Sequence, residues 1–314
     1  MKNNKYLLVS MSMSIVLMIF LMLILMSYVI TPVFSYHQND TFIANVTVGN
    51  IAPTVHDVIF DDDDGTANEI TLSSGGLIWV SCNATIVDEN GWQDVGTNGS
   101  VNATFYHHTV NATDSDDTNT HYTNTSCTFI GGSGNNVTAV CRVQMEHEAL
   151  NGTWTCNITA IDSSGGTGSN TDTATVNQLI ALSIAETNIN FGNMNPGDKT
   201  ADGNAKDINI TNEGNVKIDL KMKANSDMIC DNLGSIGPGN ISYAVTNVGY
   251  DSGAKLNNDL SFTSLTTFNL GVEGIITSDT QPATNLTYWG INIPYGVRGV
   301  CNNTITLSAI ISSD

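Results

Sequence analysis

Basic residues are scarce in this 314-residue chain: 10 Lys and Arg stand against 30 Asp and Glu, which gives a formal net charge of −20 at pH 7. Proteins that bind nucleic acid need clustered Lys and Arg to contact phosphates, so this balance argues against a nucleic-acid partner. Charged residues make up only 13% of the chain, and neutral polar residues supply the surface instead: 38 Asn, 37 Thr, 26 Ser and 28 Gly.

The motifs of the common catalytic classes are also absent. The chain contains no Gly-x-Ser-x-Gly elbow, no His-Glu-x-x-His pair, no phosphate-binding loop and no dinucleotide fingerprint. The glycine-rich residues 131–134 are typical of a hairpin tip, because no helix follows them to bind phosphate. We therefore expect a protein that is not an enzyme and needs no organic cofactor.

Long apolar runs are missing except for one at the N-terminus. Lys2 and Lys5 precede residues 6–30, which are almost entirely apolar. Positive charge ahead of such a run directs the following chain across a membrane. The run is long enough for a retained membrane anchor, and residues 33–35 offer a cleavage site for a signal peptide. Both interpretations of residues 1–35 remain open, and both place the rest of the chain outside the cytoplasm.

Cysteines never occur in the Cys-x-x-Cys spacing of zinc ribbons and thioredoxin-like sites. Their even numbers in each half of the chain instead predict disulfides formed in an oxidising compartment. Cys82, Cys127, Cys141 and Cys156 lie in the first half, and Cys230 and Cys301 lie in the second.

Asn-x-Ser/Thr sequons are frequent. There are 14 of them, whereas about eight would arise by chance from this composition. The excess predicts N-glycosylation at several sites, although abundant Asn and Thr alone would also raise the count. The candidates include Asn83, Asn102, Asn157 and Asn209.

Beyond residue 36, the sequence lacks any sustained helical period and shows the two-residue alternation of half-buried strands. Residues 80–86, 137–145 and 154–160 each alternate in this way and each place a cysteine in the apolar row. Four cysteines allow three pairings. The facing of these strands favours Cys82 with Cys156 across two sheets and Cys127 with Cys141 between neighbouring strands. Cys230 and Cys301, the two cysteines of the second half, would close that domain.

The second half alternates similarly. Residues 208–210 and 216–222, separated by a polar turn, predict a hairpin, and residues 241–245, 288–293 and 304–310 predict further strands. The Gly- and Ser-rich residues 163–170 predict a loop that precedes a domain boundary. We expect an all-β protein with an N-terminal segment (1–35), an acidic β-sandwich (36–177) and a second β-sandwich (178–314).

Several local sequences resemble known extracellular modules. Residues 50–53, 87–92, 152–156 and 160–162 resemble immunoglobulin-like domains, and residues 191–197, 212–216 and 288–294 resemble domains of secreted archaeal surface proteins. These motifs are structural. The resemblance therefore implies tandem immunoglobulin-like sandwiches at the cell surface and implies no activity.

Acidic residues concentrate in the first predicted sandwich. Residues 36–177 hold 17 Asp and Glu against one base, Arg142. Calcium is bound by six to eight oxygens from such loops, although no complete twelve-residue calcium loop is present and a solvated acidic surface would look the same. The candidate calcium ligands are Asp61, Asp62, Asp63, Asp64, Asp88, Asn90 and Asp94. His107 and His108 are predicted to be exposed on opposite faces of a strand, which argues against a joint metal site.

These observations predict a non-catalytic cell-surface or envelope protein, on the outer side of the membrane or secreted. Its expected partners are the membrane, through residues 6–30 if they are retained, and other surface proteins or glycans. One alternative is a glycan- or partner-binding module that uses calcium. Another is a filament subunit that donates residues 36–48 as a strand to a neighbouring copy.

Overall fold

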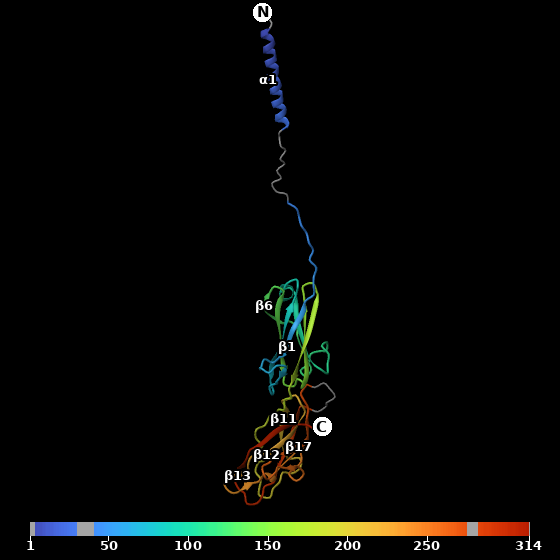
Figure 1. The fold of residues 1–314 in the computed structure, drawn as a ribbon. Coiled ribbons are helices and arrows are strands. Elements are labelled where there is room, and N and C mark those ends of the chain that lie inside the picture. Colours follow the sequence, from blue (N-terminus) through green and yellow to red (C-terminus); the bar gives the residue numbers. More distant parts are fainter. Residues whose placement is uncertain (1–3, 30–40, 275–281, 314) are drawn as a thin grey trace. The chain divides into compact units, whose positions relative to one another are not determined.

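The computed structural model describes residues 4–29, 41–274 and 282–313, which form two compact units, Met1–Gly49 and Asn50–Asp314. The first unit contains one long helix, α1 (Asn4–Val29), which coincides with the apolar run (Figure 1). Within the residues that the structure describes, no helix combines the length and the apolar character that crossing a membrane requires. The proposed cleavage site at residues 33–35 and the first part of the donor segment, residues 36–40, lie outside the described residues.

The regular secondary structure of the second unit is almost entirely strand. Its first nine strands form two sheets, ordered β1-β3-β7-β6 and β2-β9-β8-β4-β5 (Figure 1). One short helix, α2 (Gln93–Gly96), follows β3. The strands are β1 (Thr54–Asp61), β2 (Glu69–Ile70), β3 (Leu77–Val87), β4 (Ser100–His107), β5 (His121–Asn124), β6 (Thr128–Ser133), β7 (Asn136–Glu146), β8 (Gly152–Ile161) and β9 (Thr167–Val176).

The two-residue alternation produces the core between these sheets. Strands β3, β4, β7 and β8 each bury alternate side chains in one shared cluster, as Val80, Cys82, Ala84 and Ile86 do on β3. The Cys82–Cys156 disulfide joins β3 to β8 across the two sheets, and the Cys127–Cys141 disulfide links the residue before β6 to β7. These pairs are the ones expected from the facing of the strands.

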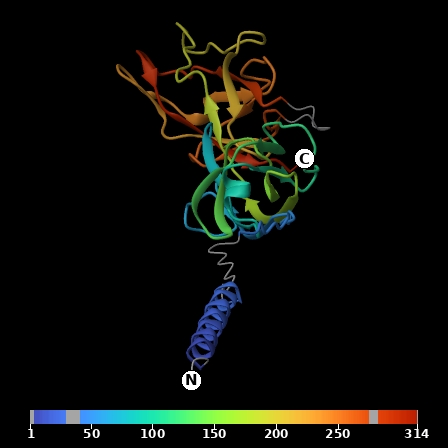
Figure 2. The same ribbon diagram turned by 90° about the horizontal axis from the view of Figure 1, so that it is seen from above.

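The remaining strands form three sheets, ordered β10-β11-β18-β15-β16, β17-β12-β20 and β14-β13-β19; Figures 1 and 2 show them in yellow to red. The Cys230–Cys301 disulfide joins β13 to β19 in the smallest of them. The strands are β10 (Leu182–Ile184), β11 (Lys206–Asn212), β12 (Ile218–Ala224), β13 (Met228–Cys230), β14 (Ser235–Ile236), β15 (Ile241–Ala244), β16 (Ala254–Lys255), β17 (Thr263–Leu270), β18 (Thr284–Ile291), β19 (Cys301–Asn302) and β20 (Ile305–Ile311), with a short 3-10 helix at Pro238–Asn240.

Two local predictions are wrong. The strands predicted as a hairpin, β11 and β12, belong to different sheets, because the buried Asn212 side chain holds the chain where it crosses. Its amide donates to the carbonyls of Val216 and Gly271, at 2.8 and 2.9 Å. Residues 163–170 are also not all loop, since β9 already begins at Thr167. Gly168 fits there because a Cβ atom would lie 2.0 Å from the carbonyl oxygen of Pro53.

Candidate functional site

Three aspartates from two neighbouring loops gather at one end of the first pair of sheets. Asp88 follows the last residue of β3, Asp94 lies in α2, and Asp162 follows the last residue of β8. One carboxylate oxygen from each lies within 4.8 Å of the others. We call Asp88, Asp94 and Asp162 the Asp88 cluster.

The carboxylates of the Asp88 cluster differ in how well they are hydrogen-bonded. Asp162 Oδ1 accepts from the amides of Ser164 and Gly166, both at 2.8 Å, and its Oδ2 accepts from the side chain of Asn50 at 2.8 Å. Asp88 is 1% exposed, and its Oδ1 accepts from the Asn90 amide at 2.8 Å. Its Oδ2 is buried and has no hydrogen-bond partner. The cluster therefore contains one buried carboxylate oxygen that no protein donor reaches.

The pKa values of Asp88 and Asp162 are shifted by these surroundings. Burial raises the pKa of Asp88, and the negative charges of Asp94 and Asp162 raise it further against the hydrogen bond from Asn90. The pKa of Asp162 is lowered, chiefly because the Asn50 side chain donates to its charged form. Burial and like charges thus disfavour the ionised form at Asp88, whereas hydrogen bonds stabilise it at Asp162.

The structure separates the seven predicted calcium ligands. Asp88 and Asp94 share the Asp88 cluster, while Asp61, Asp62 and Asp64 form another group in the loop after β1. The remaining two make other contacts: Asp63 lies 3.4 Å from the Arg142 guanidinium, and the Asn90 side chain accepts from the Ile51 amide at 2.8 Å.

Sequence reasoning missed Asp162, although a signal for it existed. Asp88 lies six residues after Cys82, and Asp162 lies six residues after Cys156. The disulfide fixes these cysteines opposite each other on two facing sheets. Equal lengths of extended chain, each about 20 Å, then bring both carboxylates to the same end.

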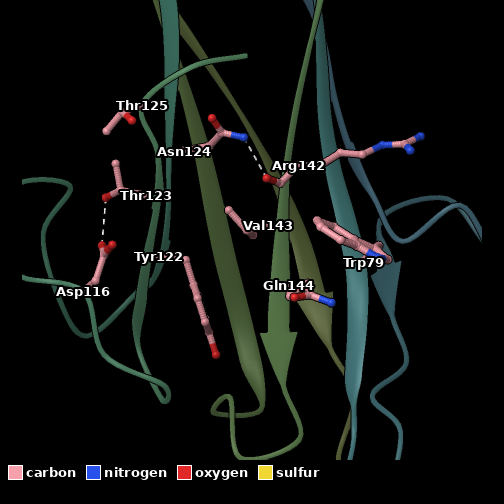
Figure 3. Close-up of a pocket in the computed structure, with 9 residues that line it drawn as sticks. All are labelled: Trp79, Asp116, Tyr122, Thr123, Asn124, Thr125, Arg142, Val143 and Gln144. Carbon is pink, nitrogen blue, oxygen red and sulfur yellow. Dashed lines mark hydrogen bonds between the residues drawn. The ribbon is translucent and has the colours of Figure 1, made fainter. Parts of the chain in front are cut away.

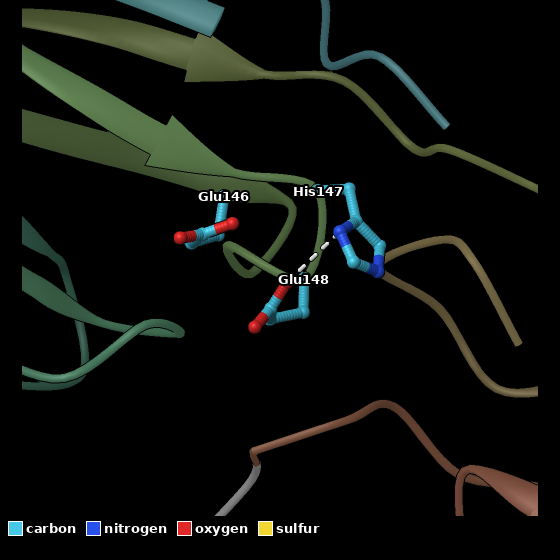
Figure 4. Close-up of side chains that lie close together, drawn as sticks. All are labelled: Glu146, His147 and Glu148. Atoms are coloured by element: carbon cyan, nitrogen blue, oxygen red, sulfur yellow. Dashed lines mark ion pairs between the residues drawn. The ribbon is translucent and has the colours of Figure 1, made fainter. Parts of the chain in front are cut away.

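A second cluster contains a histidine. Glu146 ends β7, and His147 and Glu148 follow in the turn, where Figure 4 shows Glu148 facing the imidazole. His147 Nδ1 lies 3.1 Å from Glu148 Oε2, and its Nε2 lies 3.7 Å from Glu213 Oε2. Burial raises the pKa of Glu146, and the charge of Glu148 adds to this rise while His147 opposes it. The histidine therefore lies between carboxylates from two separate loops.

Two other histidines, His107 and His121, have buried side chains. His107 is 3% exposed, and its ring contacts that of His108 with centroids 4.1 Å apart, because β4 ends at His107 and the strand alternation stops there. His121 is 1% exposed, and its Nδ1 lies 2.7 Å from a carboxylate oxygen of Asp116. The prediction of an exposed side chain is therefore wrong for His107 and correct for His108.

A shallow, open depression of about 420 Å³ lies over β5, β7 and β3 (Figure 3). Trp79 is 57% exposed at its edge, and the Asn124 side chain donates to the Arg142 carbonyl at 2.7 Å. An aromatic face beside amide and charged groups can contact a sugar or a partner's side chains. The lining residues are Trp79, Asp116, Tyr122, Thr123, Asn124, Thr125, Arg142, Val143 and Gln144.

Comparisons with known proteins identify no family. No family model and no curated protein matches the chain. Among solved structures it is similar to the C-terminal domain of the Streptococcus pyogenes antigen I/II-family protein AspA, with 11% identity, a TM-score of 0.25 and coverage of 84% of this chain and 100% of that one. It is also similar to the C-terminal domain of the Streptococcus agalactiae antigen I/II polypeptide BspA, with 10% identity, a TM-score of 0.20 and coverage of 83% of this chain and 100% of that one. A third similar structure is BcpA, the major pilin subunit of Bacillus cereus, with 11% identity, a TM-score of 0.24 and coverage of 83% of this chain and 67% of that one.

Proposed function

We propose that this chain is a non-catalytic protein of the cell surface or envelope, in which disulfide-tied β-sandwiches of immunoglobulin-like type serve as a structural or adhesive ectodomain. The observation that carries the proposal is that all six cysteines are paired. Disulfides persist in oxidising compartments and are rare in the reduced cytosol. The chain therefore folds and works outside the cytoplasm.

The apolar segment at the N-terminus supports the same location. Lys2 and Lys5 precede it, as in segments that direct a chain across a membrane. A retained anchor would hold the protein at the outer side of the membrane, and cleavage would release it to the envelope or the medium. The two outcomes differ in the N-terminal residue of the native protein.

Glycosylation forms part of the proposal. Asn83, Asn102, Asn157 and Asn209 are half-buried and lie on strands, in the rows that alternate with the core. Glycans on these rows would cover the sheets' outer faces and leave the core unchanged. Such a coat suits a surface protein with few charged side chains of its own.

The decisive experiment combines intact mass with N-terminal sequencing of protein taken from its own cells. The proposal expects a mass six hydrogens below that of the fully reduced chain, since three bridges each remove two, with additional mass removed by glycosidase. Protease applied to whole cells should digest the protein, while a cytoplasmic control protein survives. Free thiols in the native protein, together with protection from the protease, would contradict the proposal.

A second candidate function is glycan or partner binding at the depression beside Trp79, favoured by the exposure of that indole. Trp79→Ala should abolish retention on a glycan array without lowering the melting temperature. Trp92→Ala, which alters a half-buried indole that packs against the first core and does not line the depression, is the control. Equal retention by both variants would exclude this surface.

A third candidate is strand donation by residues 36–48. The described part, residues 41–48, forms no strand, and Phe42, Val46 and Val48 are exposed at alternate positions with Ala44 between them. This is the pattern of a strand that completes another sheet. Protein that begins at residue 36 should then form oligomers, and protein that begins at residue 50 should stay monomeric. Monomers in both cases would exclude donation.

A further inference from the structure

We propose that the Asp88 cluster binds one calcium ion, through carboxylate oxygens of Asp88, Asp94 and Asp162. Two ligands on opposite sides of a calcium ion lie about 4.6–5.2 Å apart, twice the usual metal–oxygen distance. One oxygen from each aspartate already lies within 4.8 Å of the others. The three residues are thus placed at a spacing that one ion can bridge.

The buried oxygen of Asp88 points independently to a ligand. Asp88 Oδ2 has no accessible surface and no hydrogen-bond partner, although the residue is 1% exposed. A buried carboxyl oxygen without a hydrogen-bond partner is costly to the folded state. A cation among the three carboxylates would supply the partner that the protein does not.

The charge of the Asp88 cluster is also unmatched by the protein. None of the ion pairs formed by the described residues includes these aspartates. Arg142 is the only Lys or Arg in residues 36–177, and its guanidinium lies against Asp63 instead. No basic side chain among the described residues therefore neutralises the cluster, and a cation from solution could do so. Oxygen-only ligands favour calcium over zinc or copper, which prefer nitrogen and sulfur.

The other acidic loop lacks these features. Asp62 Oδ1 and Oδ2 accept from the amides of Asp64 and Thr71, and Asp61 and Asp64 accept from amides of the same loop. Asp61 and Asp62 are half-buried and Asp64 is exposed. Their charges face solvent and backbone donors, so this loop serves as the internal control for acidity alone.

Calcium at this site would stabilise a third segment of the chain as well as the two loops that carry the aspartates. Asp162 holds the side chain of Asn50, and the Asn90 side chain holds the amide of Ile51, so the segment that enters the first sheet is bonded to residues of the same two loops. We expect amides of residues 50–52, 88–94 and 162–166 to exchange more slowly with deuterium when calcium is bound. The remainder of the chain should be unaffected.

The test uses the full chain freed of metal with chelator. Extracellular calcium modules have dissociation constants of about 0.1–1 mM, so ~10 mM CaCl2 should raise the melting temperature of the first core by about 3–10 °C. Magnesium at the same concentration should have a much smaller effect, because it needs shorter bonds and retains its water. No shift with calcium, or an equal shift with magnesium, would overturn the proposal.

Asp88→Asn provides the decisive variant. It keeps the oxygen that accepts from Asn90 and gives the other position an amide that can donate to Asp94 or Asp162. In chelator its melting temperature should therefore equal or exceed that of the unmodified protein, while the calcium shift disappears. Asp62→Asn should keep the full shift. Retention of the shift in Asp88→Asn, or its loss in Asp62→Asn, would refute the site.

Asp94→Asn provides an independent test of the calcium site if Asp88→Asn does not fold. Asp94 is half-buried, and its Oδ1 accepts from the Ser163 amide at 3.3 Å, a bond that Asn can retain. It should lower the affinity for calcium at least tenfold by calorimetry. Unchanged affinity in this variant would exclude Asp94 as a ligand and with it the proposed site.

Discussion

Removing the Cys82–Cys156 disulfide should cost the first core more free energy than removing Cys127–Cys141, although the same core buries all four cysteines. The bridges close segments of very different length, with sequence separations of 74 and 14. In the chain-entropy account, a bridge restricts the unfolded chain more when its loop is longer. The expected contributions are about 4.5 and about 3 kcal/mol at 25 °C.

Two double-alanine variants separate the effect of loop length from the effect of lost packing. Cys82→Ala with Cys156→Ala, and Cys127→Ala with Cys141→Ala, each remove two sulfur atoms from buried positions of one core. The losses of packing are therefore similar, and the difference of about 1.5 kcal/mol reflects loop length. A loss of ~4.5 kcal/mol is a large part of a domain's net stability of roughly 5–15 kcal/mol.

The assay is urea unfolding monitored by hydrogen exchange, which resolves individual strands. Peptides from β8 report the first core, and peptides from β12, whose side chains pack in a different cluster, provide the internal control. Protection of β8 should fall by the amounts above, and protection of β12 should not change. Equal losses in the two double variants, or a larger loss for the short loop, would refute the role of loop length.

Three further predictions concern single side chains. Burial lowers the pKa of His107, so the folded state resists a proton that the unfolded state takes up; stability should fall as pH drops below the usual value of 6.5, and His107→Gln should flatten this dependence in urea midpoints from pH 7.5 to 5. Asn215→Ala should cost about 3 kcal/mol by urea unfolding, because the buried amide accepts from Leu179 and donates to the carbonyls of Ala149 and Asn177. Arg142→Gln should change the free energy of unfolding by less than about 0.5 kcal/mol, since both it and its partner are exposed, and a larger loss would mean that the pair is not a simple surface contact.

The sequence predicts individual strands well because alternation is a local property. Residues 80–86, 137–145 and 154–160 all lie within observed strands, and the cysteines in their apolar rows meet in the core. The same rule could have placed His107 inside, since it continues the buried row of Val101, Ala103 and Phe105. The prediction gave more weight to the polar character of histidine than to the strand alternation, and the alternation predicts the burial of His107 correctly.

Pairing between strands is not local, which explains the wrong hairpin. Two alternating segments joined by a polar turn look the same whether they pair in one sheet or cross to another. What decides at residues 212–216 is the buried amide of Asn212, which bonds to Val216 nearby and to Gly271, 59 residues away in the sequence. The second contact depends on the fold itself, and no short-range pattern contains it.

The Asp88 cluster lies between these two cases. Neither the spacing of Asp88 and Asp94 nor the run at residues 61–64 distinguishes a metal ligand from a solvated carboxylate. The disulfide supplies the missing long-range constraint, since it aligns β3 with β8 and so places residues equally distant from the two cysteines at one end of the sheets. A disulfide inferred from facing strands therefore predicts more than stability. It identifies which distant side chains meet, and here it brings Asp162 to Asp88, where burial leaves one oxygen without a donor.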